Sequence, residues 1–173
     1  MTIRQEERPM SNQLNITTRN DREIVLTRTF DATRNLVWEA MSKPEILKQW
    51  LFGPPGWAMT LCEDDLRVGG KFRWGWSGPD GAEIAMHGVY REVTPPERIV
   101  RTETFDFGCD VQSGEQLGTL VLAENGDKTH LTLTVLYPSK EARDGALASG
   151  MDKGVGAGYD RLEEMLTARA ASH

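Results

Sequence analysis

The last third of the chain predicts a β-hairpin followed by a long helix. Residues 117–123 and 131–137 each suit a strand, and Asn125-Gly126 between them is typical of a two-residue hairpin turn. Pro138 ends the second strand, and Ser139 is a good helix-capping residue. Apolar residues then recur every three or four positions, which predicts one continuous amphipathic helix. They are Leu147, Met151, Val155, Tyr159, Leu162, Met165 and Leu166.

Five glycines lie within this predicted helix, and they restrict how it can pack. Each interior glycine costs about 1 kcal/mol of helix stability relative to alanine. Such a helix needs compensating tertiary contacts or a place where bare backbone is required. A curved sheet wrapped around it can enclose a cavity, so the pattern indicates binding before catalysis. The glycines are Gly145, Gly150, Gly154, Gly156 and Gly158.

Length, charge and cysteine content restrict the class of protein. With 173 residues, the chain is expected to form one main domain with a core of its own. It carries 26 acidic and 20 basic residues, a formal net charge of −6, so nucleic acid and anionic membrane surfaces are not expected partners. We find no secretory signal and no apolar run that could span a bilayer. We therefore expect a cytoplasmic protein in which Cys62 and Cys109 are free thiols.

The order of the expected elements predicts an α+β fold. Residues 1–20 are expected to form a flexible polar arm, with a short edge strand at Leu14 and Ile16 as the alternative. Residues 21–168 form the single predicted domain, and residues 169–173 form a C-terminal tail. The domain begins with a strand and two short helices, and turn residues then separate a run of antiparallel strands. We expect a curved antiparallel sheet of six to seven strands wrapped around the long C-terminal helix.

Five short segments of the chain resemble a known family. They are Arg28-Thr29-Phe30-Asp31-Ala32, Leu47-Lys48-Gln49-Trp50, residues 65–72, residues 88–100 and Gly150-Met151-Asp152-Lys153-Gly154. In this order, the resemblance spans residues 22 to 166. The chain is thereby similar to the START/polyketide-cyclase-like superfamily, and within it to the family named for the eukaryotic activator of the heat-shock-protein-ninety ATPase. The resemblance implies a helix-grip fold.

The chain departs from this family in its last helix. Val155 stands where the family commonly has a large aromatic residue. Gly156 and Gly158 are also small for the family. Both departures widen the expected cavity or loosen the helix.

Aromatic and methionine residues are spread over the elements that this fold brings together. In a filled core, five tryptophans would each need a hydrogen-bond partner for the indole N–H. Ligand cavities, in contrast, are often lined by aromatic and methionine side chains. A core position is the more common role for any single residue. Together they predict a cavity for a small apolar or aromatic molecule, lined by Trp38, Trp50, Trp57, Met59, Phe72, Trp74, Trp76, Met86, Phe105, Met151, Val155 and Tyr159.

Three polar residues are candidates for the polar end of this cavity: His87, Arg101 and Glu103. The strand around His87 has two mixed faces, and a structural histidine is more common than a catalytic one. Arg101 and Glu103 share one face of an otherwise apolar strand with Phe105. An inward pair would anchor a polar ligand group, but an outward cross-strand ion pair is the favoured interpretation.

A run of acidic residues, Glu63, Asp64 and Asp65, is interpreted as a solvated strand edge. Side chains of adjacent strand residues point to opposite faces of a sheet. Glu63 and Asp65 are therefore expected on one face, and Asp64 on the other. The sequence contains no nucleophile elbow, zinc signature or dinucleotide fingerprint. We therefore assign no catalytic residue, metal or cofactor.

Three functions are compatible with these patterns, and a cytoplasmic small-molecule-binding protein is favoured. The resemblance implies a second, a polyketide cyclase or dehydratase, which requires residues such as His87, Arg101, Glu103 or Tyr159 to converge. The family name implies a third, a stress-response co-chaperone that activates a chaperone ATPase. We rank it last because the eukaryotic activator has a further N-terminal domain that about 20 polar residues do not supply. A homodimer is compatible with the free sheet edge that helix-grip folds often leave.

Overall fold

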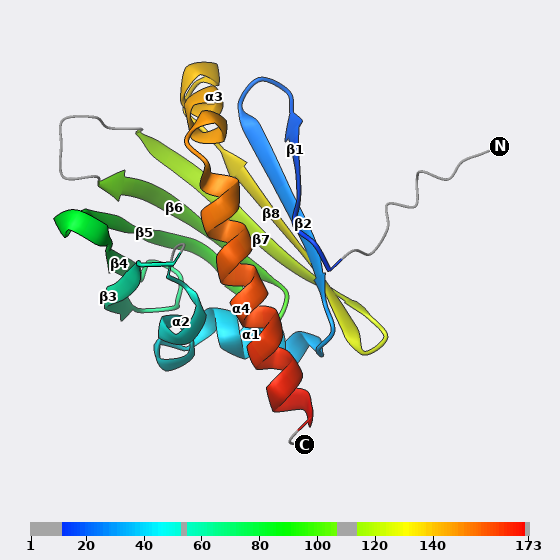
Figure 1. Cartoon of the computed structure of the whole chain (residues 1–173). Coiled ribbons are helices and arrows are strands. Elements are labelled where there is room, and N and C mark those ends of the chain that lie inside the picture. Colours follow the sequence, from blue (N-terminus) through cyan, green and yellow to red (C-terminus); the bar gives the residue numbers. More distant parts are fainter. Residues whose placement is uncertain (1–11, 53–54, 107–113, 172–173) are drawn as a thin grey trace.

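A curved antiparallel sheet wraps around the last helix of the protein (Figure 1). The computed structural model describes residues 12–52, 55–106 and 114–171. Eight strands pair in the order β1-β2-β8-β7-β6-β5-β4-β3. They are β1 (Asn15–Arg19), β2 (Glu23–Phe30), β3 (Ala58–Asp64), β4 (Lys71–Ser77), β5 (Glu83–Thr94), β6 (Arg98–Asp106), β7 (Glu115–Asn125) and β8 (Lys128–Leu136). The helices are α1 (Arg34–Ser42), α2 (Pro44–Trp50), α3 (Lys140–Ala148) and α4 (Met151–Ala171), with a short 3-10 turn at Pro79–Gly81.

The predicted α+β architecture is confirmed, although the sheet has eight strands rather than six or seven. β1 occupies the segment for which the sequence left an arm or an edge strand open. It pairs with β2, with Asn15 opposite Thr27 and Arg19 opposite Glu23. Ile16 is the one partly buried residue of β1, so the alternation that marks a strand is weak there.

The β7–β8 hairpin forms at the predicted turn. Asn125 pairs with Lys128, and Gly126 has a φ of 65°, a conformation that glycine adopts without steric cost. Buried residues alternate with more exposed ones along β7 and along the first half of β8. Leu122 and Leu131 are paired across the hairpin and belong to the main core.

Helix α4 crosses the concave face of the sheet, and its buried face forms the centre of the core (Figure 1). Tyr159, Leu162 and Leu166 lie in one cluster with buried residues of α1 and α2 and of every strand from β4 to β8. Phe30 of β2 also belongs to this cluster. Helix α2 packs beside α4, where the Trp50 and Tyr159 rings are 5.9 Å apart. The Trp50 indole donates to the Ala40 carbonyl at 3.0 Å and so connects α2 to α1.

The long C-terminal helix predicted from the apolar spacing is present as α4, but the prediction that it runs unbroken from Ser139 is wrong, because the helix is interrupted. Helix α3 ends at Ala148, and α4 begins at Met151. Gly150 has a φ of 85°, the left-handed conformation in which glycine commonly ends a helix. The apolar spacing continues across this break, so periodicity alone did not reveal it.

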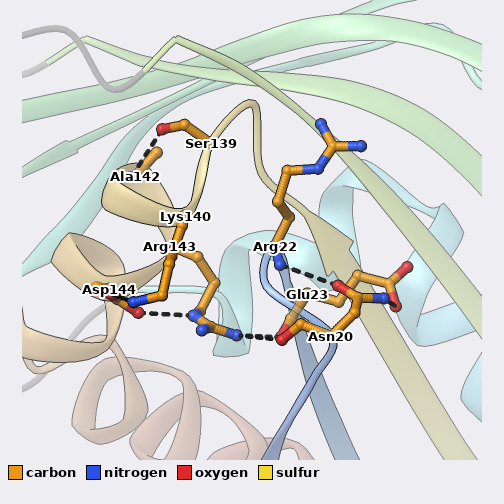
Figure 2. Close-up of polar contacts among 8 residues, drawn as sticks. All are labelled: Asn20, Arg22, Glu23, Ser139, Lys140, Ala142, Arg143 and Asp144. Carbon is orange, nitrogen blue, oxygen red and sulfur yellow. Dashed lines mark hydrogen bonds and ion pairs between the residues drawn. The ribbon is translucent and has the colours of Figure 1, made fainter.

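Helix α3 is attached to the β1–β2 turn by the buried side chain of Arg143 (Figure 2). The Arg143 Nη1 donates to the carbonyl oxygens of Asn20 and Glu23 at 3.3 and 3.2 Å. Ser139 caps the helix by accepting from the Ala142 amide at 3.0 Å. Arg143 also pairs with Asp144 at 2.8 Å, which helps to hold its guanidinium in this orientation.

Two further side-chain contacts connect the sheet to the helical part of the molecule. On one side, the Arg28 Nη1 in β2 lies 2.8 Å from the Asp160 Oδ1 in α4. On the other, the Trp76 indole in β4 donates to the Leu51 carbonyl, just after α2, at 2.7 Å. None of the helices in the described part of the chain is long and apolar enough to span a membrane.

Candidate functional site: a buried polar centre on the concave face

The strand register places a group of polar residues in the middle of the concave face. Tyr90 in β5 pairs with Arg101 in β6, which pairs with Gly118 in β7. Glu103 pairs with Gln116 two residues further along the same strands. A Cβ atom on Gly118 would lie 2.6 Å from the Glu103 Oε2. The missing side chain therefore provides the space that the Glu103 carboxylate occupies.

Arg101 and Glu103 form an inward ion pair, so the favoured outward orientation is wrong. The Arg101 Nε lies 2.9 Å from the Glu103 Oε2, and the Gln116 amide donates to the Glu103 Oε1 at 2.8 Å. The Glu103 side chain is 5% exposed, whereas that of Arg101 is 16% exposed. The pair can lie inward because Gly118 leaves room for it and Gln116 completes its hydrogen bonds.

Two aromatic rings support the guanidinium of Arg101. Its Cζ lies 5.2 Å from the ring centre of Phe72 and 4.8 Å from that of Trp74. Such cation–π contacts are strongest where water is largely excluded. Burial lowers the pKa of Arg101, whereas the Glu103 carboxylate and the neighbouring Tyr90 and Asp64 raise it. The raising effects together outweigh burial, so the net shift of this pKa is upward. Arg101 is therefore a permanent cation held at a fixed position.

Asp64, the last residue of β3, also faces this centre. Its Oδ1 accepts from the Tyr90 hydroxyl at 2.7 Å, and its Oδ2 accepts from the Trp74 indole at 3.1 Å. Burial raises the pKa of Asp64, with these two hydrogen bonds and Arg101 opposing the shift. The sequence placed Asp64 in a solvated edge, but the same alternation that sends Glu63 and Asp65 outward sends Asp64 inward. We call Asp64, Tyr90, Arg101, Glu103 and Gln116 the Arg101 centre.

Tyr159 faces the Arg101 centre from α4. Its ring packs edge-on against Phe30, with ring centres 5.7 Å apart. Burial raises the pKa of Tyr159 to about 12, and both Arg101 and Glu103 act on it electrostatically. Its hydroxyl makes no hydrogen bond to any residue that the structure describes. The helix therefore presents a neutral donor toward the polar centre of the sheet.

Most of the predicted lining residues belong to the main core or pack against it, but two do not. Trp50, Phe72, Trp74, Met86 and Tyr159 are buried in the main core, and Trp38, Met59, Trp76, Phe105 and Val155 pack against it partly exposed. Met151 instead packs on a second cluster that contains Tyr137. Trp57 lies outside both clusters, with its ring against Gly78.

His87 lies on the opposite, outer face of the sheet. It is exposed and lines a surface hollow of about 470 Å³ together with Lys71, Arg73 and Glu115. A second hollow of about 300 Å³ is lined by Arg22, Arg91 and Tyr137 among others. His87 is therefore separated from the Arg101 centre by the sheet.

No metal site is formed by the residues that the structure describes, where His, Cys, Asp and Glu side chains are nowhere grouped by three or more in a suitable arrangement. Cys62 is a free thiol whose pKa is raised, chiefly by burial. Cys109 lies outside the described residues.

Comparison with known proteins identifies the family. The model of the activator of Hsp90 ATPase homolog 1-like proteins matches residues 31–167. The chain belongs to this family. A search of curated proteins gave no match. The predicted resemblance is therefore confirmed for the family, and with it the helix-grip superfamily to which the fold corresponds.

Solved structures of similar proteins share this helix-grip architecture. A protein from Rhodobacter sphaeroides is 33% identical, has a TM-score of 0.83, and matches over 90% of this chain and 99% of its own. Protein NE0264 from Nitrosomonas europaea is 26% identical, with a TM-score of 0.75 and coverage of 88% and 99%. Protein Ms6760 from Mycobacterium smegmatis is 25% identical, with a TM-score of 0.79 and coverage of 89% and 96%.

Proposed function

We propose that this protein binds a small apolar or aromatic molecule between the concave face of the sheet and α4, with the Arg101 centre at the polar end of the site. The observation that supports this most is the Arg101 side chain. It lies in the middle of the sheet beneath α4, among aromatic rings, and yet 16% of it is exposed. Burying an ion pair has a large desolvation cost, so such a pair reached by solvent is a natural place for a ligand group.

A partly exposed apolar surface extends from the Arg101 centre toward one end of β3 to β6. Met59 pairs with Trp76 across β3 and β4, and Met86 pairs with Phe105 across β5 and β6. Met59, Trp76 and Phe105 are only partly buried, although they pack against the main core. Aromatic and methionine side chains that retain contact with solvent are suited to a flat apolar ligand. The proposal rests on this exposure rather than on a closed cavity.

Binding of the neutral fluorescent probe N-phenyl-1-naphthylamine tests the proposal. We expect saturable binding by the wild-type protein and at least tenfold weaker binding by Phe105→Arg, because the new charge would occupy the apolar surface. Val68→Arg is the matched control, since Val68 is 62% exposed and outside the core. Both variants are checked for folding by circular dichroism. Absence of saturable binding to the wild type, or equal losses in the two variants, would contradict the proposal.

A second candidate function, a cyclase or dehydratase acting on polyketide-like substrates, is favoured by one observation. Arg101, Glu103 and Tyr159 converge on the concave face, as such an enzyme would require, although His87 does not. Incubation with a linear poly-β-ketone followed by mass spectrometry of the products tests this function. A cyclised or dehydrated product formed by the wild type and lost in Tyr159→Phe supports it. An unchanged substrate contradicts it.

A further inference from the structure

We propose that the Arg101 centre selects a neutral hydrogen-bond acceptor, such as the carbonyl oxygen of an aromatic ketone, over a carboxylate. This inference rests on the proposed function, because it names the class of ligand that the same site would take. It follows from the charges and hydrogen bonds already present around Arg101.

The positive charge of Arg101 is compensated before any ligand arrives. Glu103 lies 2.9 Å from its Nε and is almost completely buried. Asp64 lies on the other side, linked through the Tyr90 hydroxyl at 2.7 Å, and it acts electrostatically on Arg101. One guanidinium thus faces two carboxyl groups. A ligand carboxylate at Arg101 would meet like charges without a surplus of positive charge to balance it.

The hydrogen bonds of the centre point to an acceptor rather than a donor in the ligand. Both oxygens of Glu103 are engaged, by Arg101 and Gln116. Both oxygens of Asp64 are engaged, by Tyr90 and Trp74. The donors that remain are the hydroxyl of Tyr159, which makes no hydrogen bond within the described part of the chain, and those terminal N–H groups of Arg101 that are not used by the neighbouring Tyr90 hydroxyl. A ligand oxygen that accepts from these donors satisfies them without adding charge.

The side chains around these donors favour a planar, apolar body on the ligand. Phe72 and Trp74 lie against the guanidinium, with their ring centres 4.7 Å apart. Trp74 in turn packs edge-on to Trp76, which is partly exposed. An aromatic ring bearing one carbonyl group would contact this series of rings while its oxygen reaches Arg101. The centre is thereby suited to an uncharged aromatic carbonyl compound.

Three probes of similar shape separate charge from acceptor strength: 2-acetonaphthone, 2-naphthoate and 2-isopropenylnaphthalene. The first has a neutral acceptor, the second a carboxylate, and the third neither. Quenching of tryptophan fluorescence at pH 7 gives the dissociation constants. We expect 2-acetonaphthone to bind at least tenfold more tightly than 2-naphthoate and at least threefold more tightly than 2-isopropenylnaphthalene.

Two variants then change the charge of the centre. Glu103→Gln leaves Asp64 as the one carboxyl group of the centre that compensates Arg101, so the affinity for 2-naphthoate should rise at least tenfold while that for 2-acetonaphthone changes less than threefold. Because removing one partner of a buried ion pair can unfold a protein, Asp64→Asn provides a milder change in the same direction. The matched control is Glu63→Gln, which neutralises the adjacent carboxylate on the outer face. It should leave both affinities unchanged.

The outcomes distinguish the inference from the proposed function. If 2-naphthoate binds as tightly as 2-acetonaphthone, and neither charge variant alters the ratio, the site binds aromatic molecules but the selectivity is wrong. If no probe binds, both the proposed function and the selectivity are overturned. A rise in 2-naphthoate affinity in Asp64→Asn or Glu103→Gln but not in Glu63→Gln supports the inference.

Discussion

Gly118 shows at the scale of single residues how a missing side chain makes room for a polar group. It stands opposite Arg101 in the β6–β7 pairing, with the Glu103 carboxylate over its Cα. Glycine normally weakens a strand, because it has no side chain to pack. At this position its cost is offset by the space that it provides for a buried charge.

Replacing Gly118 by alanine should therefore destabilise the protein. The new methyl group would lie 2.6 Å from the Glu103 Oε2 and would displace the carboxylate from Arg101 or Gln116. We expect a loss of about 1–3 kcal/mol in the free energy of unfolding, as for other buried polar groups that lose a partner. Urea denaturation measures it. Gly145→Ala in α3, where no atom lies within 4 Å of the new Cβ, is the control and should not destabilise. Equal stability of the two variants would contradict this explanation.

The polar residues were the hardest part of the site to predict from the sequence. Alternation places Arg101 and Glu103 on the same face as Ile99, a core residue, and Phe105, which packs against the core, and this pattern is compatible with an inward pair. The general cost of burying charge favoured the outward choice instead. What the sequence did not reveal was the compensation, because Gly118 and Gln116 approach the pair only through the register of β6 and β7.

At the scale of elements, Gly150 separates α3 from α4 and allows each helix to pack on its own part of the sheet. Helix α3 is attached to the β1–β2 turn by the hydrogen bonds of Arg143, and α4 lies across the main core. We expect Gly150→Ala to lower the free energy of unfolding by about 1–2 kcal/mol, because alanine is strained at a φ of 85°. Thermal denaturation measures the change. An unchanged melting temperature would show that the break tolerates an ordinary residue.

The glycines inside α4 differ in what surrounds them. A Cβ atom on Gly156 would have one contact, Leu14 at 3.8 Å, whereas a Cβ atom on Gly158 would lie 3.4 Å from the Trp50 carbonyl oxygen. We expect Gly156→Ala to stabilise the protein by about 0.4–1 kcal/mol through lower unfolded-chain entropy, and Gly158→Ala to gain less. Chemical denaturation of both variants measures the difference. A larger gain at Gly158 would contradict the close approach of α4 to α2.

The elements themselves could largely be predicted from local patterns. The Asn125-Gly126 turn, for example, correctly predicted the hairpin of β7 and β8. The helix break and β1 were harder to predict. Apolar spacing runs through Gly150 without interruption, and β1 has one partly buried residue. Both depend on tertiary contacts that local sequence does not encode.

At the scale of the whole molecule, all three tyrosines share one electrostatic property. Burial raises the pKa of Tyr90, Tyr137 and Tyr159, the last to about 12. In the unfolded chain they ionise near pH 10. The folded state therefore holds its protons where the unfolded state loses them, so this stability is fully present below about pH 10 and is lost as pH rises toward 12.

We accordingly expect tyrosine ionisation and unfolding to occur together. Phenolate absorbance at 295 nm should stay low in the folded protein at pH 10.5 and should rise with the loss of the circular dichroism signal. Tyr159→Phe should reduce the total absorbance change by about one third, because it removes one of three tyrosines, and should move alkaline unfolding to higher pH. Phenolate absorbance that rises near pH 10 while the fold is intact would contradict the burial of these hydroxyls.

The whole architecture could be predicted because consecutive antiparallel strands and one terminal helix allow few arrangements. A wide sheet must curl or cover its apolar face, and α4 is long enough to cover it. The Arg101 centre could not be predicted in this way. It depends on the few side chains that the register and curvature bring together, and these come from β3, β5, β6 and β7.

The sheet is open, with β1 and β3 as its free edges, and side chains such as Arg28 and Trp76 are among its links to the helices. Its curvature can therefore change without separating any pair of strands. If the side of the sheet that carries β3 and β4 swings away from α4, the interior widens while the ladder of backbone hydrogen bonds stays intact. Under the proposed function, such a hinge-like opening at the β3 edge would admit a ligand with no strand having to unfold.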